Sequence, residues 1–153
     1  MTEINPTPAA LRARYRRIHA ERMQGLPIVN AALDVATAGF RPFESHALGV
    51  LVTPWFMNLV VLPGDDTWAD EAQGAVVSID LPAGTQEMTV HRDEELGLYL
   101  SVVLYRDVTP LASTDEAVEL GANIVERLFE PPAADAPPAR LSRRALFAGA
   151  GTD

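Results

Sequence analysis

Residues 47–64, ALGVLVTPWFMNLVVLPG, form the longest stretch of the chain without an ionisable side chain. Aliphatic and aromatic residues dominate it, and such side chains pack well on the pleated surface of a β-sheet. Pro54 divides the stretch, because proline lacks a backbone N–H donor and restricts the residue before it. Gly64, following Pro63, ends the second half. The stretch therefore predicts two buried strands joined by a turn at Pro54.

The same stretch also approaches the length of a membrane-spanning helix. Pro54 and Asn58 interrupt it near the middle, and polar groups are costly within a bilayer. A pair of buried strands explains the same composition, so we expect no membrane insertion.

A chain of 153 residues is expected to fold as one domain that buries about two thirds of its unfolded surface. It contains no cysteine, which excludes disulfides, thiolate metal sites and a cysteine nucleophile. No apolar segment follows Arg16-Arg17, so we do not expect the arginine-rich start to be a secretory signal. The expected location is the cytoplasm.

The net charge of −9 disfavours nucleic-acid binding, which depends on positive side chains. All 12 basic residues are arginines, and residues 25–139 hold four of them against 18 acids, a net charge of −14. A middle of that sign favours cationic ligands, or else it is a solvated acidic surface that aids solubility.

An N-terminal helix is predicted over residues 8–24, with Thr7 as N-cap and Pro8 in the first turn. Leu11 and Tyr15 lie on the face that would cover a sheet. The arginines on its other faces are either solvated or form a docking face for an acidic partner.

Alternating apolar residues predict further strands at 33–40, 75–81, 87–91 and 98–105. Gly39 marks a bulge or the end of the first, and the Arg41-Pro42 step turns the chain toward the central pair. The last strand is apolar on both faces, so we expect it to be central. Pro82 and Gly84 supply a turn, and residues 93–97 form an acidic one.

A second helix begins at Ser113, where Glu116 has the spacing of a capping box, and runs to about Phe129. Proline and alanine then predict an extended linker. We therefore expect one α+β domain over residues 1–132, an antiparallel sheet of about six strands flanked by an N-terminal and a C-terminal helix. Residues 133–153 form a Pro/Ala linker and an arginine-containing extended tail.

Two tryptophans are candidate binding residues, because tryptophan often anchors protein interfaces. Trp55 and Trp68, with Thr53-Pro54 and the nearby acids, predict an apolar groove with a negative rim. Such a groove suits a peptide that is basic at one end and apolar at the other. The alternative is that both tryptophans are lids on the core.

The tail contains Arg143-Arg144 followed by Leu146 and Phe147, which resembles a twin-arginine export motif at the wrong end of the chain. We hypothesise that it imitates a ligand of the domain and occupies the binding site until that ligand arrives. The alternative is a last strand or helical turn that closes the core.

Motifs for phosphate binding, serine hydrolysis or zinc binding are absent from the sequence. His46 and His91, with nearby acids, would ligate a metal only if the fold brought them together, and the paired acids fit solvated turns. We expect no catalytic residues, no metal site and no cofactor.

Several motifs together, spread over residues 8–149, resemble the HybE-type nickel-iron hydrogenase assembly chaperones. They are Gly49-Val50-Leu51-Val52-Thr53-Pro54-Trp55, Pro63-Gly64, Trp68, Leu81-Pro82-x-Gly84, Tyr99-Leu100-Ser101 and Arg143-Arg144-Ala145-Leu146-Phe147. The resemblance implies a mixed α and β fold and a non-enzymatic cytoplasmic chaperone. Some relatives carry a rubredoxin-like iron domain, but a chain without cysteine inherits no iron site from them.

The resemblance implies binding of a hydrogenase precursor before assembly and export, with the small subunit and its twin-arginine leader as the first candidate and the large subunit as the second. Other maturation proteins are further possible partners. The expected partner-binding residues are Thr53, Pro54, Trp55, Trp68, Arg143 and Arg144. Two alternatives stay open: a small metal or cofactor carrier that uses His46 and His91, and an adaptor between two maturation proteins.

Overall fold

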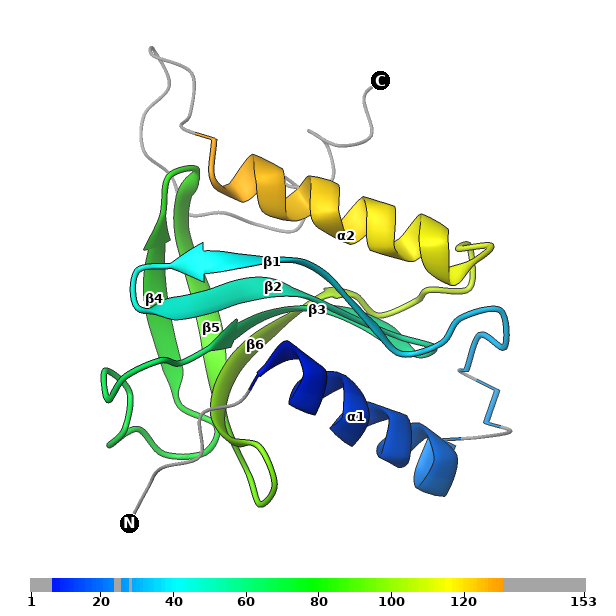
Figure 1. Ribbon diagram of the computed structural model, residues 1–153, viewed down its shortest axis with the longest axis horizontal. Helices are drawn as coiled ribbons and strands as arrows, with labels where there is room; N and C mark the ends of the chain where they lie inside the picture. The colour runs from blue at the N-terminus through cyan, green and yellow to red at the C-terminus, as the bar shows by residue number, and fades with distance from the viewer. Residues whose placement is uncertain (1–6, 24–25, 28, 131–153) are drawn as a thin grey trace.

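A computed structural model describes residues 7–23, 26–27 and 29–130. It shows a six-stranded antiparallel sheet with one helix on each face (Figure 1). This confirms the predicted α+β class, the approximate strand number and the two flanking helices. The elements in chain order are α1 (Pro8–Ile18), η1 (His19–Met23), β1 (Ala36–Phe43), β2 (His46–Thr53), β3 (Phe56–Leu62), β4 (Val76–Leu81), β5 (Gly84–Asp93), β6 (Gly97–Tyr105) and α2 (Thr114–Leu128).

The strand order is β1-β2-β3-β6-β5-β4, so two three-stranded meanders meet where β3 pairs with β6. The uncharged stretch forms β2 and β3, with Pro54 and Trp55 in the turn between them. Strand β6 is central, as predicted. Neither helix within the described ranges has the length and apolar run needed to cross a bilayer.

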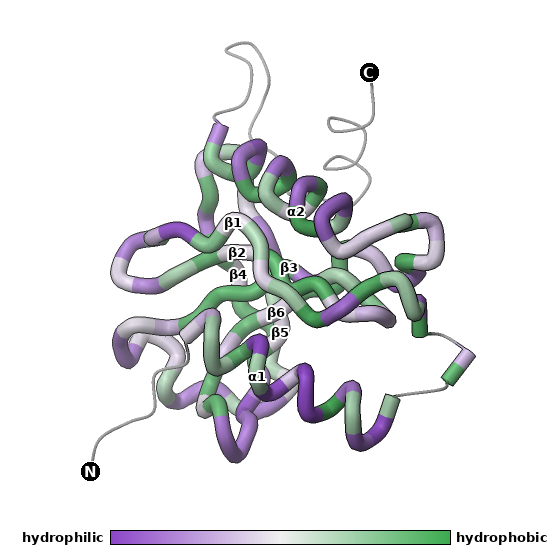
Figure 2. The backbone as a smooth tube through the Cα atoms, turned by 45° about the vertical axis from the view of Figure 1, so that its right-hand side comes forward, coloured by the Kyte–Doolittle hydropathy of each residue, from purple (hydrophilic) through white to green (hydrophobic). Residues whose placement is uncertain are grey.

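Helix α2 covers the outer part of one sheet face, against β1 and β2. Its buried stripe includes Ala117, Gly121, Ile124 and Leu128, as the sequence predicted. In Figure 2 hydrophobic and hydrophilic positions alternate along this helix, as expected of an amphipathic element. Gly121 allows close approach, because a Cβ there would lie 2.9 Å from the Val50 side chain.

Both helix starts are capped as predicted. The Thr7 hydroxyl accepts from the N–H of Ala10, and the Ser113 hydroxyl accepts from the N–H of Glu116. The Glu116 carboxylate reaches back to the N–H of Ala112, one residue before the cap.

Helix α1 covers the opposite face with a smaller core. Leu11 is fully buried there, and the described sequence continues after α1 as the π-helical segment η1. The core on this side contains Leu11, Val35, Leu51, Val60, Leu62, Leu96 and Tyr99.

Strand β1 differs from its prediction. It begins at Ala36 and continues through Pro42 to Phe43, and the turn falls at Glu44, whose φ is 55°. Proline is tolerated because β1 is an edge strand. The alternative of a bulge at Gly39 is confirmed, since the pairing register shifts around it. Strand β5 is also longer than the predicted 87–91.

Candidate functional site

The turn between β2 and β3 is organised by a buried threonine. The Thr53 hydroxyl donates to the carbonyl of Phe56 at 3.0 Å and accepts from the N–H groups of Trp55 and Phe56 at 3.2 and 3.0 Å. The carbonyl of Pro54 accepts from the N–H of Asn30 at 2.7 Å. Thr53 and Pro54 are buried and Trp55 is partly exposed. The turn therefore presents Trp55 on a rigid support.

The Trp55 indole lies beside His19, the first residue of η1. Its ring centroid is 5.8 Å from that of His19 and 5.7 Å from that of Phe56. Tyr15 on α1 continues this aromatic row, 6.1 Å from Phe56. Trp55 thus extends the α1-side core to the surface.

Trp68 occupies a different place, in the loop after β3. Its ring lies against that of His46, tilted by 37° with a centroid separation of 4.5 Å, and it packs against the core under α2. The His46 Nδ1 accepts from the N–H of Gly64 at 3.0 Å. The loop is therefore tied to the start of β2 through this histidine.

The structure does not bring the two tryptophans into one groove. Thr53 pairs with Phe56 at one end of the β2–β3 hairpin, and Ala47 pairs with Leu62 at the other. Trp55 follows the first end and Trp68 the second. The predicted shared groove is wrong, because a turn at Pro54 and a loop after Leu62 leave a hairpin at opposite ends.

Of the acids near Trp68, Asp65 stabilises the loop through side-chain hydrogen bonds. The hydroxyls of Ser45 and Thr67 donate to Asp65, and these bonds lower the Asp65 pKa to about 2. Asp66 and Asp70 are exposed. These carboxylates adjoin Trp68, far from Trp55.

The arginines of α1 bind the acidic turn between β5 and β6. Arg14 lies 3.3 Å from Asp93 and 3.0 Å from Glu95, and Arg17 also pairs with Glu95. Arg16 pairs with Asp34. Both predictions for these arginines, solvation or a docking face for a partner, missed this intramolecular role.

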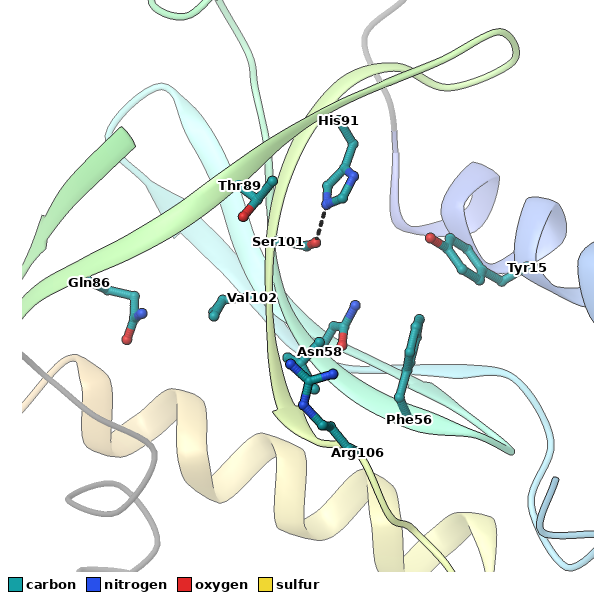
Figure 3. A pocket seen from close by; sticks show the side chains of 10 residues that line it. Tyr15, Phe56, Asn58, Gln86, Thr89, His91, Ser101, Val102 and Arg106 are labelled. Atoms are coloured by element: carbon teal, nitrogen blue, oxygen red, sulfur yellow. Dashed lines mark hydrogen bonds between the residues drawn. The ribbon is translucent and has the colours of Figure 1, made fainter. Parts of the chain in front are cut away.

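A pocket of about 510 Å³, lined by both polar and apolar side chains, opens where β5 and β6 separate (Figure 3). The pairing of the two strands ends at Thr89 and Ser101. Volumes of about 300–1,000 Å³ are typical of ligand sites. The polar lining residues are Asn58, Gln86, Thr89, His91, Ser101 and Arg106.

Two pairs of side chains shape this pocket. The His91 Nε2 lies 2.7 Å from the Ser101 hydroxyl, and its ring stacks on Tyr99. Burial lowers the pKa of His91, so the imidazole is neutral at pH 7. Asn58 is only 6% exposed, and its Oδ1 has no hydrogen-bond partner within the described residues.

The sequence analysis cited Asn58 only as evidence that residues 47–64 do not span a membrane, and it gave Arg106 no role. A signal was present, since Asn58 is the one polar residue of β3, and a lone amide in a buried strand requires a partner. Arg106 carries no such signal, because its position beside the pocket follows from the pairing of β6.

The two histidines proposed as ligands lie on opposite faces of the sheet. His46 contacts Phe43 and Trp68 of the α2-side core, whereas His91 stacks on Tyr99 of the α1-side core. They cannot share an ion. Within the described part of the chain, no group of three histidine or acidic residues is placed to hold a metal. Arg143 and Arg144 lie outside the described residues, as does the tail hypothesis built on them.

Comparison with known proteins identifies the family. The model of the nickel-iron hydrogenase assembly chaperone HybE matches residues 6–149. The chain is 39% identical over 142 residues to the hydrogenase expression/formation protein HoxT of Azotobacter vinelandii, covering 90% of this chain and 92% of that one. It is 37% identical over 129 residues to the probable rubredoxin HupJ of Rhodobacter capsulatus, and the match covers 83% of this chain and 46% of that longer relative.

Comparison of the fold with solved structures points to the same family. The solution structure of HybE from Escherichia coli matches with a TM-score of 0.68 and 25% identity, covering 93% of each chain. The chain therefore belongs to the HybE family of nickel-iron hydrogenase assembly chaperones.

Proposed function

We propose that this chain is a cytoplasmic, non-catalytic chaperone that binds a precursor subunit of a nickel-iron hydrogenase before assembly and export. The observation that carries the proposal is the family match over residues 6–149. The proposed ligand is the small subunit with its twin-arginine leader, and the large subunit is the second candidate.

The β2–β3 turn is the proposed contact for the leader. Trp55 is partly exposed and rigidly supported, and tryptophan in such a position often dominates binding energy. Thr53 and Pro54 are buried, so their role in this proposal is to hold Trp55 in place. An apolar leader segment would pack on Trp55 and the adjoining Phe56.

Trp68 is the second proposed contact, and the acids beside it fit the basic end of a leader. A ligand that touches both tryptophans must reach both ends of the β2–β3 hairpin rather than enter a single groove. Arg143 and Arg144 enter the proposal as imitators of the leader's arginine pair.

The test is isothermal titration of the full chain with the small-subunit precursor, with and without its leader. Binding that requires the leader and weakens at least tenfold in Trp55→Ala supports the proposal. Trp68→Ala tests the second contact in the same titration. Equal binding of both forms of the precursor would refute leader recognition.

The tail is tested separately by deleting residues 140–153. If the tail imitates the leader, the deletion raises affinity for a synthetic twin-arginine peptide, because competition within the chain is removed. Unchanged or lower affinity contradicts the imitation.

A further inference from the structure

The floor of the pocket between β5 and β6 contains a polar atom that has no hydrogen-bond partner among the described residues. The Asn58 Oδ1 is buried without a hydrogen-bond partner among the described residues. Leaving a buried polar group unpaired is costly, so such groups are rare unless they serve a purpose. Ser101, also buried, forms the adjoining floor.

A bulge places this asparagine. Met57 pairs with Tyr105 and Asn58 pairs with Val103, so β6 has one extra residue, Leu104, opposite the Met57–Asn58 step. Bulges occur often beside functional sites, where they redirect a side chain. The irregularity thus lies beside the one residue of the pocket floor that lacks a partner.

The chemistry of Asn58 points to a peptide group. A side-chain amide carries one acceptor and one donor group side by side, which matches the N–H and C=O of a backbone amide. Phe56 and Val103 supply apolar lining next to it. Figure 3 shows Phe56 and Tyr15 on the same side of β6 as the Asn58 amide.

Arg106 adds a positive charge at the edge of the same pocket. It is the one permanently charged residue among those lining the pocket, and it is exposed. Among the ion pairs of the described residues, none involves Arg106. The neighbouring Asp107 accepts hydrogen bonds from Thr109. A guanidinium of this kind is suited to a carboxylate.

We propose that the pocket formed by Asn58, Ser101 and Arg106 binds the carboxyl-terminal residues of an extended polypeptide. Arg106 pairs with the terminal carboxylate, Asn58 bonds the last peptide group, and the terminal side chain packs against Phe56 and Val103. A carboxyl terminus is the part of a polypeptide that combines a free carboxylate with an adjacent amide.

This site differs from the proposed leader contact. Trp55 lies in the β2–β3 turn and does not line the pocket, and a leader rich in arginine would be repelled by Arg106. A chaperone with both sites would hold its client at a basic leader and at a free carboxyl terminus. The pocket proposal does not rest on leader binding.

The test uses the full chain and a library of fluorescein-labelled hexapeptides, each made as the free acid and as the carboxyl-terminal amide. We expect a subset of free acids to bind and their amides to bind at least tenfold more weakly, measured by fluorescence anisotropy. If no free acid binds, or if acids and amides bind alike, the proposal is wrong.

Variants locate the binding. Arg106→Gln is expected to weaken binding of the selected free acids at least tenfold. Arg127 on α2 is also exposed, so Arg127→Gln is the matched control and should leave binding unchanged. Asn58→Leu removes the amide and should abolish preference for a peptide over a plain carboxylate. Equal losses in both arginine variants would indicate nonspecific charge attraction and overturn the site.

A second arm separates a polypeptide from a small molecule. N-acetylalanine carries the same carboxylate and amide, and we expect it to compete only at concentrations at least a hundredfold above the Kd of the peptide. Competition at equal concentration would assign the pocket to a small carboxylate and refute a polypeptide ligand. Leader binding, measured with the Arg106→Gln variant, should be unaffected, so the two proposals fail separately.

Discussion

The hydroxyl groups of Tyr15 and Tyr99 lie 2.9 Å apart, although 84 sequence positions separate them. Burial raises the pKa of both side chains, and the bond joins α1 to the central strand β6. We predict that Tyr15→Phe destabilises the fold by about 1–2 kcal/mol, because Tyr99 then keeps a buried hydroxyl without a partner. Urea unfolding measures this.

The double variant Tyr15→Phe/Tyr99→Phe is the matched control. It removes both hydroxyls, so we expect it to be no less stable than the single Tyr15→Phe variant. If the destabilisation of the double variant equals the sum of the destabilisations caused by Tyr15→Phe and Tyr99→Phe alone, the hydroxyl pair does not link the helix to the sheet.

The Arg14–Asp93 ion pair predicts an acid-sensitive attachment of α1. Burial would raise the pKa of Asp93, but hydrogen bonds from the N–H groups of Glu95 and Leu96 and the charge of Arg14 outweigh it, so the pKa is lowered. The folded carboxylate thus contributes stability at neutral pH that is lost as the pH falls below its ordinary pKa of 3.8.

Asp93→Asn tests this attachment. We expect the variant to lose about 1 kcal/mol of unfolding free energy at pH 7, since the ion pair is partly exposed. Between pH 5 and about pH 2, the stability of the variant should fall less than that of the parent chain. An unchanged acid profile would show that Asp93 makes no pH-dependent contribution.

His91 predicts a separate pH dependence at a higher range. Its pKa is lowered by burial, so below about pH 6.5 the unfolded chain binds more protons than the folded one. The contribution of neutral His91 to the free energy of unfolding is therefore fully present above about pH 6.5 and declines as the pH falls. His91→Gln should flatten the stability profile between pH 7 and 5, as followed by thermal unfolding.

Gly64 predicts a strong steric constraint on the Trp68 loop. A Cβ there would collide with the carbonyl oxygen of Ser45, so Gly64→Ala should cost about 2–3 kcal/mol and alter Trp68 fluorescence. Gly74→Ala is the comparison, because Gly74 has open space around it and a φ of +88°. It should cost about 1 kcal/mol through backbone strain alone.

Much of the fold could be predicted from the sequence because local signals agreed. Thr7 and Ser113 marked the helix starts, Pro54 marked the central turn, and alternation marked the strands. Pro42 misled the prediction of β1, since a proline is read as a turn unless the strand is known to lie at an edge. Edge position depends on strand order, which no local pattern contains.

The candidate sites were less predictable for the same reason. Trp55 and Trp68 are 13 positions apart in the sequence, yet the hairpin separates them. The pocket joins residues of α1, β3, β5 and β6, and only the β3–β6 pairing brings Asn58 close to Ser101. Composition predicted an acidic middle of the chain but gave no indication of a pocket that Arg106 lines.

The strand order also has a consequence for how the chain folds. Within each meander every strand pairs with its neighbour in sequence, and the pairing of β3 with β6 joins the two halves at long range. Since long-range pairing is the slower step, we expect the halves to form first and the seam to close last. Asn58 belongs to one half and Ser101 to the other, so the pocket floor exists only after that closure. A peptide that binds there would hold the two halves together and slow the unfolding of the whole chain.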